Sequence, residues 1–267
     1  MSFNLAYPSE QLKPYIKQYW AIENVLKSGE SYLQRIVPSG LPEMILYLDH
    51  KPKSEKRPIE AHCLLNGQHN DYYDLIISEN LSIFSVLFQP QGVREFFNLP
   101  FNELTNQSVP LAFINQTLSR ELESRLSEGI SFTDRVNIAE DILSGLLTVH
   151  SKDYDFKRMS HSLELIKKAK GMVDIDFLSQ QACLSRKQFE RLFSEHIGIS
   201  PKQYLRIIRF QSALHNNSQS NHWSMTQLAL ESGYYDQSHF INDFKALTGL
   251  TPKKFFADCD SVSDFFG

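Results

Sequence analysis

The feature that most constrains this chain is a phrase that occurs twice. "GISPKQYL" begins at Gly198 and "GLTPKKFF" begins at Gly249, 51 positions later. Each Gly follows an apolar periodic stretch, where a helix commonly ends on a residue with left-handed backbone. Two residues later comes Ser or Thr followed by Pro, the preferred N-cap and first helical residue. Each phrase therefore predicts a helix end followed at once by a helix start.

The residues before each phrase also match. In "SRKQFERLFSEHIG", Ser185 and Gln188 occupy the positions of a capping box, and Phe189 lies on an apolar face with Phe193. "DQSHFINDFKALTG" places two Phe residues on the same face 51 positions later. A shorter helix is expected before each, in "DIDFLSQQA" and in "SMTQLALES". Two short helices joined by a tight turn, with a polar face left on the second helix, are typical of a helix-turn-helix.

The polar faces of the two longer helices carry side chains that suit base edges. These are Arg186, Lys187, Glu190 and Arg191 in the first copy, and Gln237, Ser238, Ile241 and Asn242 in the second. Arg and Lys suit guanine, Gln and Asn suit adenine, and Glu suits the cytosine amino group. The connecting segment "SPKQYLRIIRFQSALH" predicts a helix of about 22 Å, enough to set the two faces roughly one DNA turn apart. A solvated charged face is the alternative, and the duplication favours DNA contact over it.

The back 95 or so residues resemble the DNA-binding domain of AraC/XylS-type transcription regulators. The residues that carry the resemblance are Ala229, Gly233, Gln237, Ser238, Phe240, Phe244, Lys245, Gly249, Pro252 and Phe255. The resemblance implies two recognition helices in adjacent major grooves, with base contacts from Lys187, Glu190, Arg191, Gln237, Ser238 and Asn242. Two positions depart from the family pattern: Cys183 stands where Gly is usual, and Asn242 stands where Arg is common.

Three cationic residues of the connecting helix have other expected roles. Arg209 matches a family Arg and is expected to be a structural salt-bridge partner. Lys202 and Arg206 are candidates for phosphate contacts.

The front of the chain, to about residue 110, predicts antiparallel β-structure, because short apolar runs alternate with turn residues. It resembles the uncharacterised β-rich N-terminal domains of some bacterial members of the family, in "LKPYIKQYW", "RIVPSGLPEMILYL" and "FQPQGVREFFNLPFNELTNQSVPL". A cupin-like barrel is a fold-level analogy only. Two helices are expected after Leu111, in "LAFINQTLSRELESRLSEG" and "SFTDRVNIAEDILSGLLTVH". The first carries an apolar stripe that is either a dimer seam or packing against the protein's own sheet, formed by Leu111, Ile114, Leu118, Leu122 and Leu126.

The fold class is therefore α+β with two domains. The expected divisions are 1–150 for a β-rich sensing or oligomerisation domain, 151–162 for a linker, 163–257 for the double helix-turn-helix domain and 258–267 for a tail. Charge is distributed accordingly: residues 1–150 carry 12 basic and 18 acidic side chains, and the remainder carries 15 and 13. An acidic sensor joined to a mildly basic reader would show this split. No apolar run reaches membrane length and no signal region is evident, so a cytoplasmic location is expected.

The sequence contains few residues that suggest catalysis or metal binding. Three Cys residues form no paired motif, His62 and His69 are expected to be loop residues, and no catalytic motif stands out, so no enzyme activity, metal or cofactor is expected. One alternative is a DNA-repair alkyltransferase that uses Cys63 as its nucleophile. Another is a regulator that acts through protein partners without a small-molecule effector.

The expected partners are double-stranded DNA, a small-molecule effector at the N-terminal domain, RNA polymerase and a second copy of the chain, with no membrane. Tyr19, Trp20, Tyr72 and Tyr73 either line an effector pocket or form core.

Overall fold

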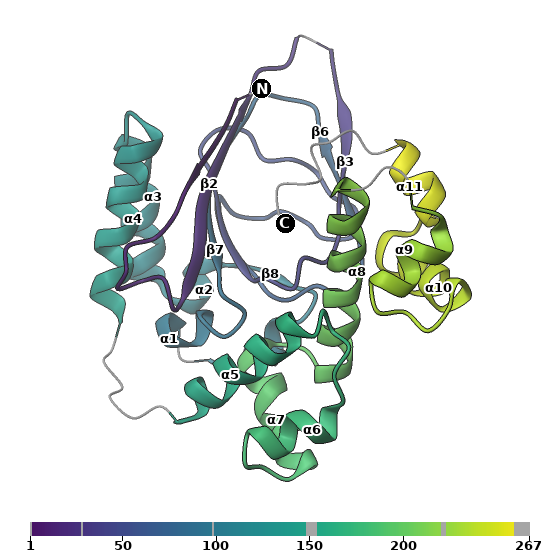
Figure 1. Cartoon of the computed structure of the whole chain (residues 1–267). Coiled ribbons are helices and arrows are strands. Elements are labelled where there is room, and N and C mark those ends of the chain that lie inside the picture. Colours follow the sequence, from purple (N-terminus) through teal and green to yellow (C-terminus); the bar gives the residue numbers. More distant parts are fainter. Residues whose placement is uncertain (1, 28, 98, 148–153, 220–222, 259–267) are drawn as a thin grey trace. The chain divides into compact units, whose positions relative to one another are not determined.

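The computed structural model describes residues 2–27, 29–97, 99–147, 154–219 and 223–258. Their contacts divide the chain into two compact units. The N-terminal unit comprises residues 1–35, 41–68 and 73–152, and the C-terminal unit comprises residues 36–40, 69–72 and 153–267. A β-rich unit followed by a helical unit confirms the α+β fold class (Figure 1).

The N-terminal unit is built on a six-stranded antiparallel sheet of strand order β1-β2-β7-β4-β5-β8, accompanied by a two-stranded sheet of β3 and β6. The strands are β1 (Ser2–Ala6), β2 (Ile16–Asn24), β3 (Tyr32–Ile36), β4 (Glu43–Tyr47), β5 (Cys63–Asn66), β6 (Tyr73–Ile77), β7 (Leu81–Phe88) and β8 (Ser108–Pro110). The longest pairing joins β2 to β7, with Trp20 opposite Ser85. The expected antiparallel β-structure is confirmed.

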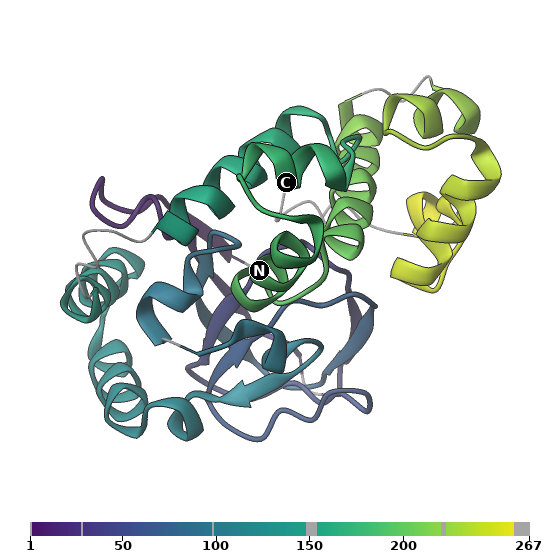
Figure 2. The same cartoon turned by 90° about the horizontal axis from the view of Figure 1, so that it is seen from below.

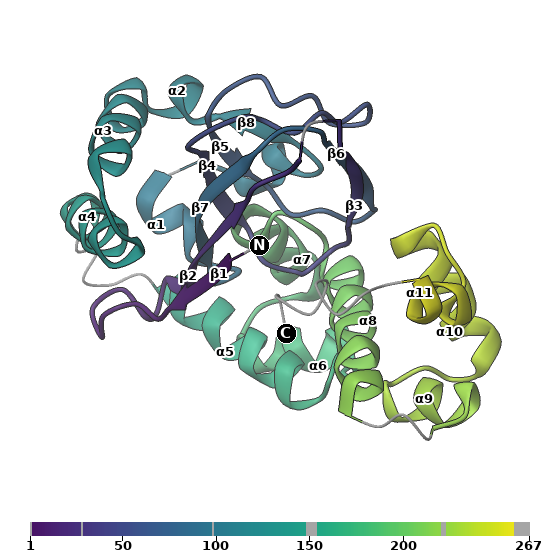
Figure 3. The same ribbon diagram turned by 90° about the horizontal axis from the view of Figure 1, so that it is seen from above.

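Helices cover one face of this sheet, as Figures 1 and 3 show. The helical elements of the unit are α1 (Val93–Phe97), a 3-10 helix η1 (Phe101–Leu104), α2 (Leu111–Ile114), α3 (Gln116–Glu128) and α4 (Phe132–Leu146). Leu118, Leu122 and Leu126 of α3 lie in one apolar core with Phe84 and Val86 of β7. The leucine stripe of α3 therefore packs inside its own unit, and the core accounts for its spacing without a dimer seam.

The first of the two expected helices is broken at Asn115. This residue takes an extended conformation (φ −151°), and its side-chain oxygen accepts a hydrogen bond from the Leu118 amide at 3.0 Å. An Asn that caps the following turn ends one helix and begins the next. The second expected helix begins as predicted, because Ser131 and Asp134 form a complete capping box.

The C-terminal unit is all helical. It contains α5 (Tyr154–Lys168), α6 (Ile175–Gln181), α7 (Arg186–Ile197), α8 (Pro201–Gln219), α9 (Met225–Glu231), α10 (Gln237–Thr248) and α11 (Pro252–Asp258). The long helix α8 lies between the group α5 to α7 and the group α9 to α11 (Figures 2 and 3). At 19 residues it is about 28 Å long, somewhat more than the sequence indicates.

Part of the segment expected to be a linker belongs to this unit. From Tyr154 onward it is the first half of α5, and Met159 is fully buried in the helical core. Residues 151–153 lie outside the described part of the chain. Two residues of the same core, Phe189 and Phe240, occupy the matching positions that the repeat predicts, and both are fully buried. No helix in the described ranges is long and apolar enough to cross a membrane.

Candidate nucleic-acid interface

The first helix-turn-helix consists of α6 and α7. The Asp174 carboxylate caps α6 by accepting hydrogen bonds from two backbone amides. Ser185 and Gln188 form the complete capping box that begins α7, and α7 ends at Gly198 with φ 96°. The predicted start and end of this recognition helix are confirmed.

The second helix-turn-helix consists of α9 and α10. Ser224 and Gln227 form a complete capping box at the start of α9. Asp236 caps α10 by accepting a hydrogen bond from the His239 amide at 2.7 Å. Helix α10 ends at Gly249 with φ 73°, so both repeated phrases are helix ends on left-handed Gly.

The two turns have the same backbone course despite the departure at Cys183. Cys183 takes a left-handed conformation with φ 55°, and Gly233 takes φ 86°. The next amide closes each turn onto its support helix: the Leu184 amide donates to the Ser179 carbonyl at 3.0 Å, and the Tyr234 amide donates to the Ala229 carbonyl at 3.0 Å. The tight turn therefore forms without Gly, at the steric cost that a side chain has in this region.

The second turn is one residue longer than the first. Cys183 and Gly233 are 50 positions apart, whereas the N-caps Ser185 and Asp236 are 51 positions apart. The additional residue is Tyr235, whose side chain is 88% exposed. The repeat is therefore offset by 50 residues in its support helices and by 51 in its recognition helices.

Most of the predicted reading residues are exposed on their helices. Arg186, Lys187, Arg191, Gln237, Ser238 and Asn242 are exposed, and Glu190 and Ile241 are partly buried. Position by position, α7 offers four charged side chains where α10 offers four uncharged ones. The two units thus share their helix arrangement but differ in the charge of the side chains at equivalent exposed positions.

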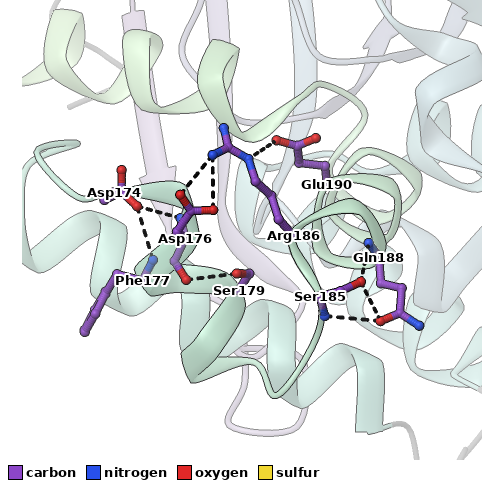
Figure 4. A network of polar contacts seen from close by, with 8 residues as sticks. All are labelled: Asp174, Asp176, Phe177, Ser179, Ser185, Arg186, Gln188 and Glu190. Carbon is purple, nitrogen blue, oxygen red and sulfur yellow. Dashed lines mark hydrogen bonds and ion pairs between the residues drawn. The ribbon is translucent and has the colours of Figure 1, made fainter.

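Arg186 is held by two carboxylates (Figure 4). Its Nη1 lies 3.0 Å from Oδ2 of Asp176 on α6, and its Nε lies 3.1 Å from Oε1 of Glu190 one turn along α7. The hydrogen bond to Glu190 and the charge of Asp176 raise the pKa of Arg186 above its ordinary value. All three side chains are about half exposed, so the network positions the guanidinium at the surface more than it stabilises the fold.

The second unit has a neutral counterpart of this contact. Thr226 of α9 donates from Oγ1 to Oε1 of Gln237 at 3.0 Å. Thr226 lies 50 positions after Asp176, and Gln237 lies 51 positions after Arg186. A support helix therefore orients the first side chain of the recognition helix in both units, by an ion pair in one and by a neutral hydrogen bond in the other. Sequence reasoning missed both support residues, because the 51-residue repeat pairs Asp176 with Gln227 and only the 50-residue offset of the support helices pairs it with Thr226.

The connecting helix α8 carries a second polar cluster. Arg206 Nε lies 2.8 Å from Oδ1 of Asp243 on α10, and Arg209 Nη2 lies 3.9 Å from the other carboxylate oxygen. Arg209 also donates from Nη1 to the Gly171 carbonyl at 3.1 Å. The expectation that Arg209 is a salt-bridge partner is confirmed. Arg206 is engaged in the same way, while Lys202, the other phosphate candidate, is exposed.

Of the four aromatic residues considered for an effector pocket, Trp20 and Tyr73 both lie near Glu43, whereas Tyr19 lies in the core and Tyr72 belongs to the C-terminal unit. Tyr19 is fully buried in the core beneath α4, and its hydroxyl donates to Glu140 at 2.9 Å. Trp20 follows it on the opposite face of β2 and donates from Nε1 to Glu43 at 2.8 Å. Tyr73 is buried beneath the Arg57 guanidinium, which lies 4.4 Å from its ring centre. Tyr72 is partly buried.

The residues considered for chemistry are unsuited to it. Cys63 is 1% exposed, and burial raises the pKa of its thiol to about 12, which keeps it in the unreactive protonated form. The His62 ring contacts the Tyr47 carbonyl through Nδ1 at 2.8 Å. In the part of the chain that the structure describes, no three His, Cys, Asp or Glu side chains gather as metal ligands would.

Comparison with known proteins identifies the class of the C-terminal unit. Residues 178–258 match the family described as "Helix-turn-helix domain", and these residues form a domain of that class. Within it they are of the AraC/XylS type, so the resemblance is confirmed for this part of the chain. Residues 5–110 match the family described as "Domain of unknown function (DUF6597)".

The curated relatives are similar in the helix-turn-helix part. An "Uncharacterized HTH-type transcriptional regulator" of Haemophilus influenzae is 40% identical over 81 residues, which are 30% of this chain and 27% of the relative. The "HTH-type transcriptional regulator ArgR" of Pseudomonas aeruginosa is 32% identical over 82 residues, which are 30% of this chain and 24% of the relative. The chain thus spans about a quarter of the length of these relatives.

Two solved structures of regulators also align with this chain, each with a TM-score below 0.5. The DNA-binding domain of AdpA in complex with a target DNA has a TM-score of 0.36 and 22% identity, over 38% of this chain and 90% of that one. ToxT from Vibrio cholerae has a TM-score of 0.48 and 11% identity, over 91% of this chain and 99% of that one.

Proposed function

We propose that this chain is a sequence-specific DNA-binding transcription regulator in which α7 and α10 enter successive major grooves. The observation that carries the proposal is the duplication: two recognition helices with exposed polar faces are fixed to one connecting helix. A single helix-turn-helix reads one half-site. Two of them on one chain would read a bipartite site without a second copy.

The chemistry of the two faces suggests a division of roles. On α7, Lys187 and Arg191 would supply charge-assisted contacts to guanine or phosphate, and Glu190 would accept from a cytosine amino group. On α10, Gln237 and Asn242 would pair with adenine edges, with Ser238 and Ile241 beside them. Arg186 would approach the DNA only in the direction that Asp176 and Glu190 allow.

Selection of bound duplexes from a random pool by the full chain tests this function. The expected result is a bipartite consensus whose halves differ and whose centres lie about one helical turn apart. Affinity should fall steeply with salt, because cationic side chains displace counterions from phosphates. Recovery of no enriched sequence, or of a single half-site only, would contradict the proposal.

We further propose that the N-terminal unit controls the DNA-binding unit by binding a small molecule. The observation that favours it is a buried carboxyl on the sheet face opposite the helices. Glu43 Oε1 accepts hydrogen bonds from Trp20 Nε1 at 2.8 Å and from Ser85 Oγ at 2.5 Å. Burial raises the pKa of Glu43 to about 7. A buried carboxyl is costly, and buried groups with shifted pKa values are often found at functional sites.

A thermal-shift screen of the full chain against metabolites tests this control. A ligand present at 100 times its Kd stabilises the folded form by about 2.7 kcal/mol. The expected result is a stabilising compound whose effect is lost in Glu43→Gln. If no compound shifts the transition, a regulator that acts through protein partners, RNA polymerase among them, is the better description.

The remaining assignments follow from this role. A regulator of this kind acts in the cytoplasm, where bacterial DNA lies, and we assign it no enzymatic activity and no cofactor. Cys63 is a poor nucleophile for alkyl transfer because its thiol is buried and protonated. Size-exclusion chromatography with light scattering would decide between a monomer and a homodimer.

A further inference from the structure

The acidic residue Asp243 stands out because it lies on a recognition helix and faces away from the reading face. Its side chain is 15% exposed, whereas its neighbour Asn242 is exposed. Helix α10 turns Phe240 and Phe244 into the core and Gln237 and Ser238 outward, which leaves Asp243 at the flank that meets α8. A mostly buried carboxylate at this flank is therefore poorly placed to read bases.

Three cationic or protonatable side chains surround this carboxylate. Arg206 Nε approaches one oxygen at 2.8 Å, and Arg209 Nη2 and His239 Nε2 approach the other at 3.9 and 3.6 Å. Arg206 Nη2 also donates to the Asp243 carbonyl at 3.4 Å. Helix α8 thus contacts α10 at both the side chain and the backbone carbonyl of Asp243.

Arg209 links this cluster to the turn that precedes the first helix-turn-helix. Its guanidinium donates to the Gly171 carbonyl, in the turn between α5 and α6, and lies 5.7 Å from the ring centre of Tyr234, in the turn before α10. The same two turns also touch directly, since a Cβ added at Gly233 would lie 2.5 Å from Cγ of Met172. The turn before α6 and the turn before α10 therefore lie together, and Asp243 is an acidic group beside the Arg209 that contacts both turns.

We propose that Asp243 is a positioning residue. It fixes the rotation and the distance of recognition helix α10 relative to recognition helix α7. By anchoring α10 to Arg206 and Arg209, it makes the pair of helix-turn-helix units one rigid reader with one preferred spacing between half-sites. This inference rests on the proposed DNA-binding function and adds the determinant of spacing to it. A buried ion pair is weak evidence of added stability, and in some proteins such a pair fixes a unique geometry, which is the role assigned to Asp243.

Spacing discrimination is the readout that a merely stabilising role would not move. One base pair inserted between the halves rotates the second half-site by about 34° and shifts it by about 3.4 Å. For the unaltered chain we expect the insertion to weaken binding about tenfold or more, the scale of a lost base contact. For Asp243→Asn we expect the same insertion to weaken binding by about threefold or less, because α10 can follow the displaced groove.

Glu195→Gln is the matched control. Glu195 also carries a partly buried carboxylate on a recognition helix, but its ion pair with Arg191 at 3.6 Å stays within α7. Both variants remove one negative charge near DNA. This change affects the Kd for the original duplex and the Kd for the duplex with the inserted base pair equally, so it cancels in the ratio of the two Kd values. Asp243→Glu keeps the carboxylate and should keep most of the ratio. An unchanged ratio in Asp243→Asn, or an equal change in Glu195→Gln, would overturn the proposal.

A measurement without DNA separates this proposal from the function on which it rests. Spin labels at Lys187→Cys and Ala246→Cys, with the native cysteines replaced by Ser, report the distance between α7 and α10. Asp243→Asn should broaden the distance distribution at least twofold, whereas Glu195→Gln should not. An unchanged distance distribution in Asp243→Asn would contradict the positioning role alone. A broadened distribution, together with a chain that selects no duplex, would contradict the DNA-reading function alone. Should Asp243→Asn unfold, Arg206→Gln removes the same 2.8 Å pair and is measured in the same way.

Discussion

The two helix-turn-helix units have the same backbone arrangement but differ in the charge of their exposed faces. Both recognition helices begin at a side-chain cap, run for 12 residues and end on a left-handed Gly. On α7 the four outward positions are charged, and on α10 the four equivalent positions are uncharged. The comparison shows that duplication conserves the residues that build a helix and leaves the residues on its free face to diverge.

The reading faces provide the largest test of this difference. Lys187→Ala with Arg191→Ala should weaken binding roughly a hundredfold and reduce the salt slope by about 2. Ser238→Ala with Asn242→Ala should weaken binding by only about tenfold and leave the slope unchanged, because neutral contacts release no counterions. Fluorescence anisotropy titrations at several salt concentrations measure both quantities. Equal slopes for the two double variants would show that the units do not divide the work by charge.

The turn of the second unit should tolerate a side chain less well than the turn of the first unit does. Gly233→Ala puts a Cβ on a backbone with φ 86° and 2.5 Å from Met172 Cγ, so we expect a loss of about 2 kcal/mol in the free energy of unfolding. Gly145→Ala is the control, because nothing lies within 4 Å of a Cβ there and Ala favours the helix by up to about 1 kcal/mol. Urea unfolding distinguishes the two. A neutral Gly233→Ala would mean that the turn relaxes as the first turn does.

The turn of the first unit should respond in the opposite direction. Cys183→Gly removes a side chain from a backbone with φ 55°. We expect a gain of about 0.5 kcal/mol, since relief of the left-handed strain outweighs the greater freedom of Gly in the unfolded chain. The same urea titrations measure it. Destabilisation by Cys183→Gly would show that the Cys side chain has a packing role.

The smallest expected effect concerns the support helices. Asp176→Asn should strengthen DNA binding about twofold, because it frees Arg186 from one carboxylate and removes a negative charge near the reading face. Thr226→Val removes the equivalent contact to Gln237 but changes no charge, so its Kd should stay within about twofold of the original. Binding titrations at low salt check both. A weakened Asp176→Asn would mean that the ion pair preorganises Arg186 for a base contact.

The sequence predicted the frame of both units because their signals are local. Capping boxes such as Ser185 with Gln188 depend on residues three positions apart, and the structure contains them. The turn at Cys183 was the exception. Its left-handed backbone, followed by the hydrogen bond from the Leu184 amide to the Ser179 carbonyl, goes against the conformational preference of the residue itself.

Contacts between helices could not be predicted in the same way. The approach of Asp176 to Arg186, and of Asp243 to Arg206, depends on how separate helices pack. Their positions in the sequence give no sign of the pairing. In the N-terminal unit, alternation predicted strands, but the pairing of β2 with β7 joins segments about 60 residues apart, which no short pattern encodes.

The additional Tyr235 has a practical consequence for anyone who edits this protein. Because the support helices are related by 50 positions and the recognition helices by 51, the two units cannot be exchanged as whole blocks under one alignment. A chimaera aligned on the support helices would start α10 one residue out of phase, a rotation of about 100° that turns core phenylalanines toward solvent. Grafts of new binding specificity should therefore be aligned on the helix caps, with each turn left as the chain has it.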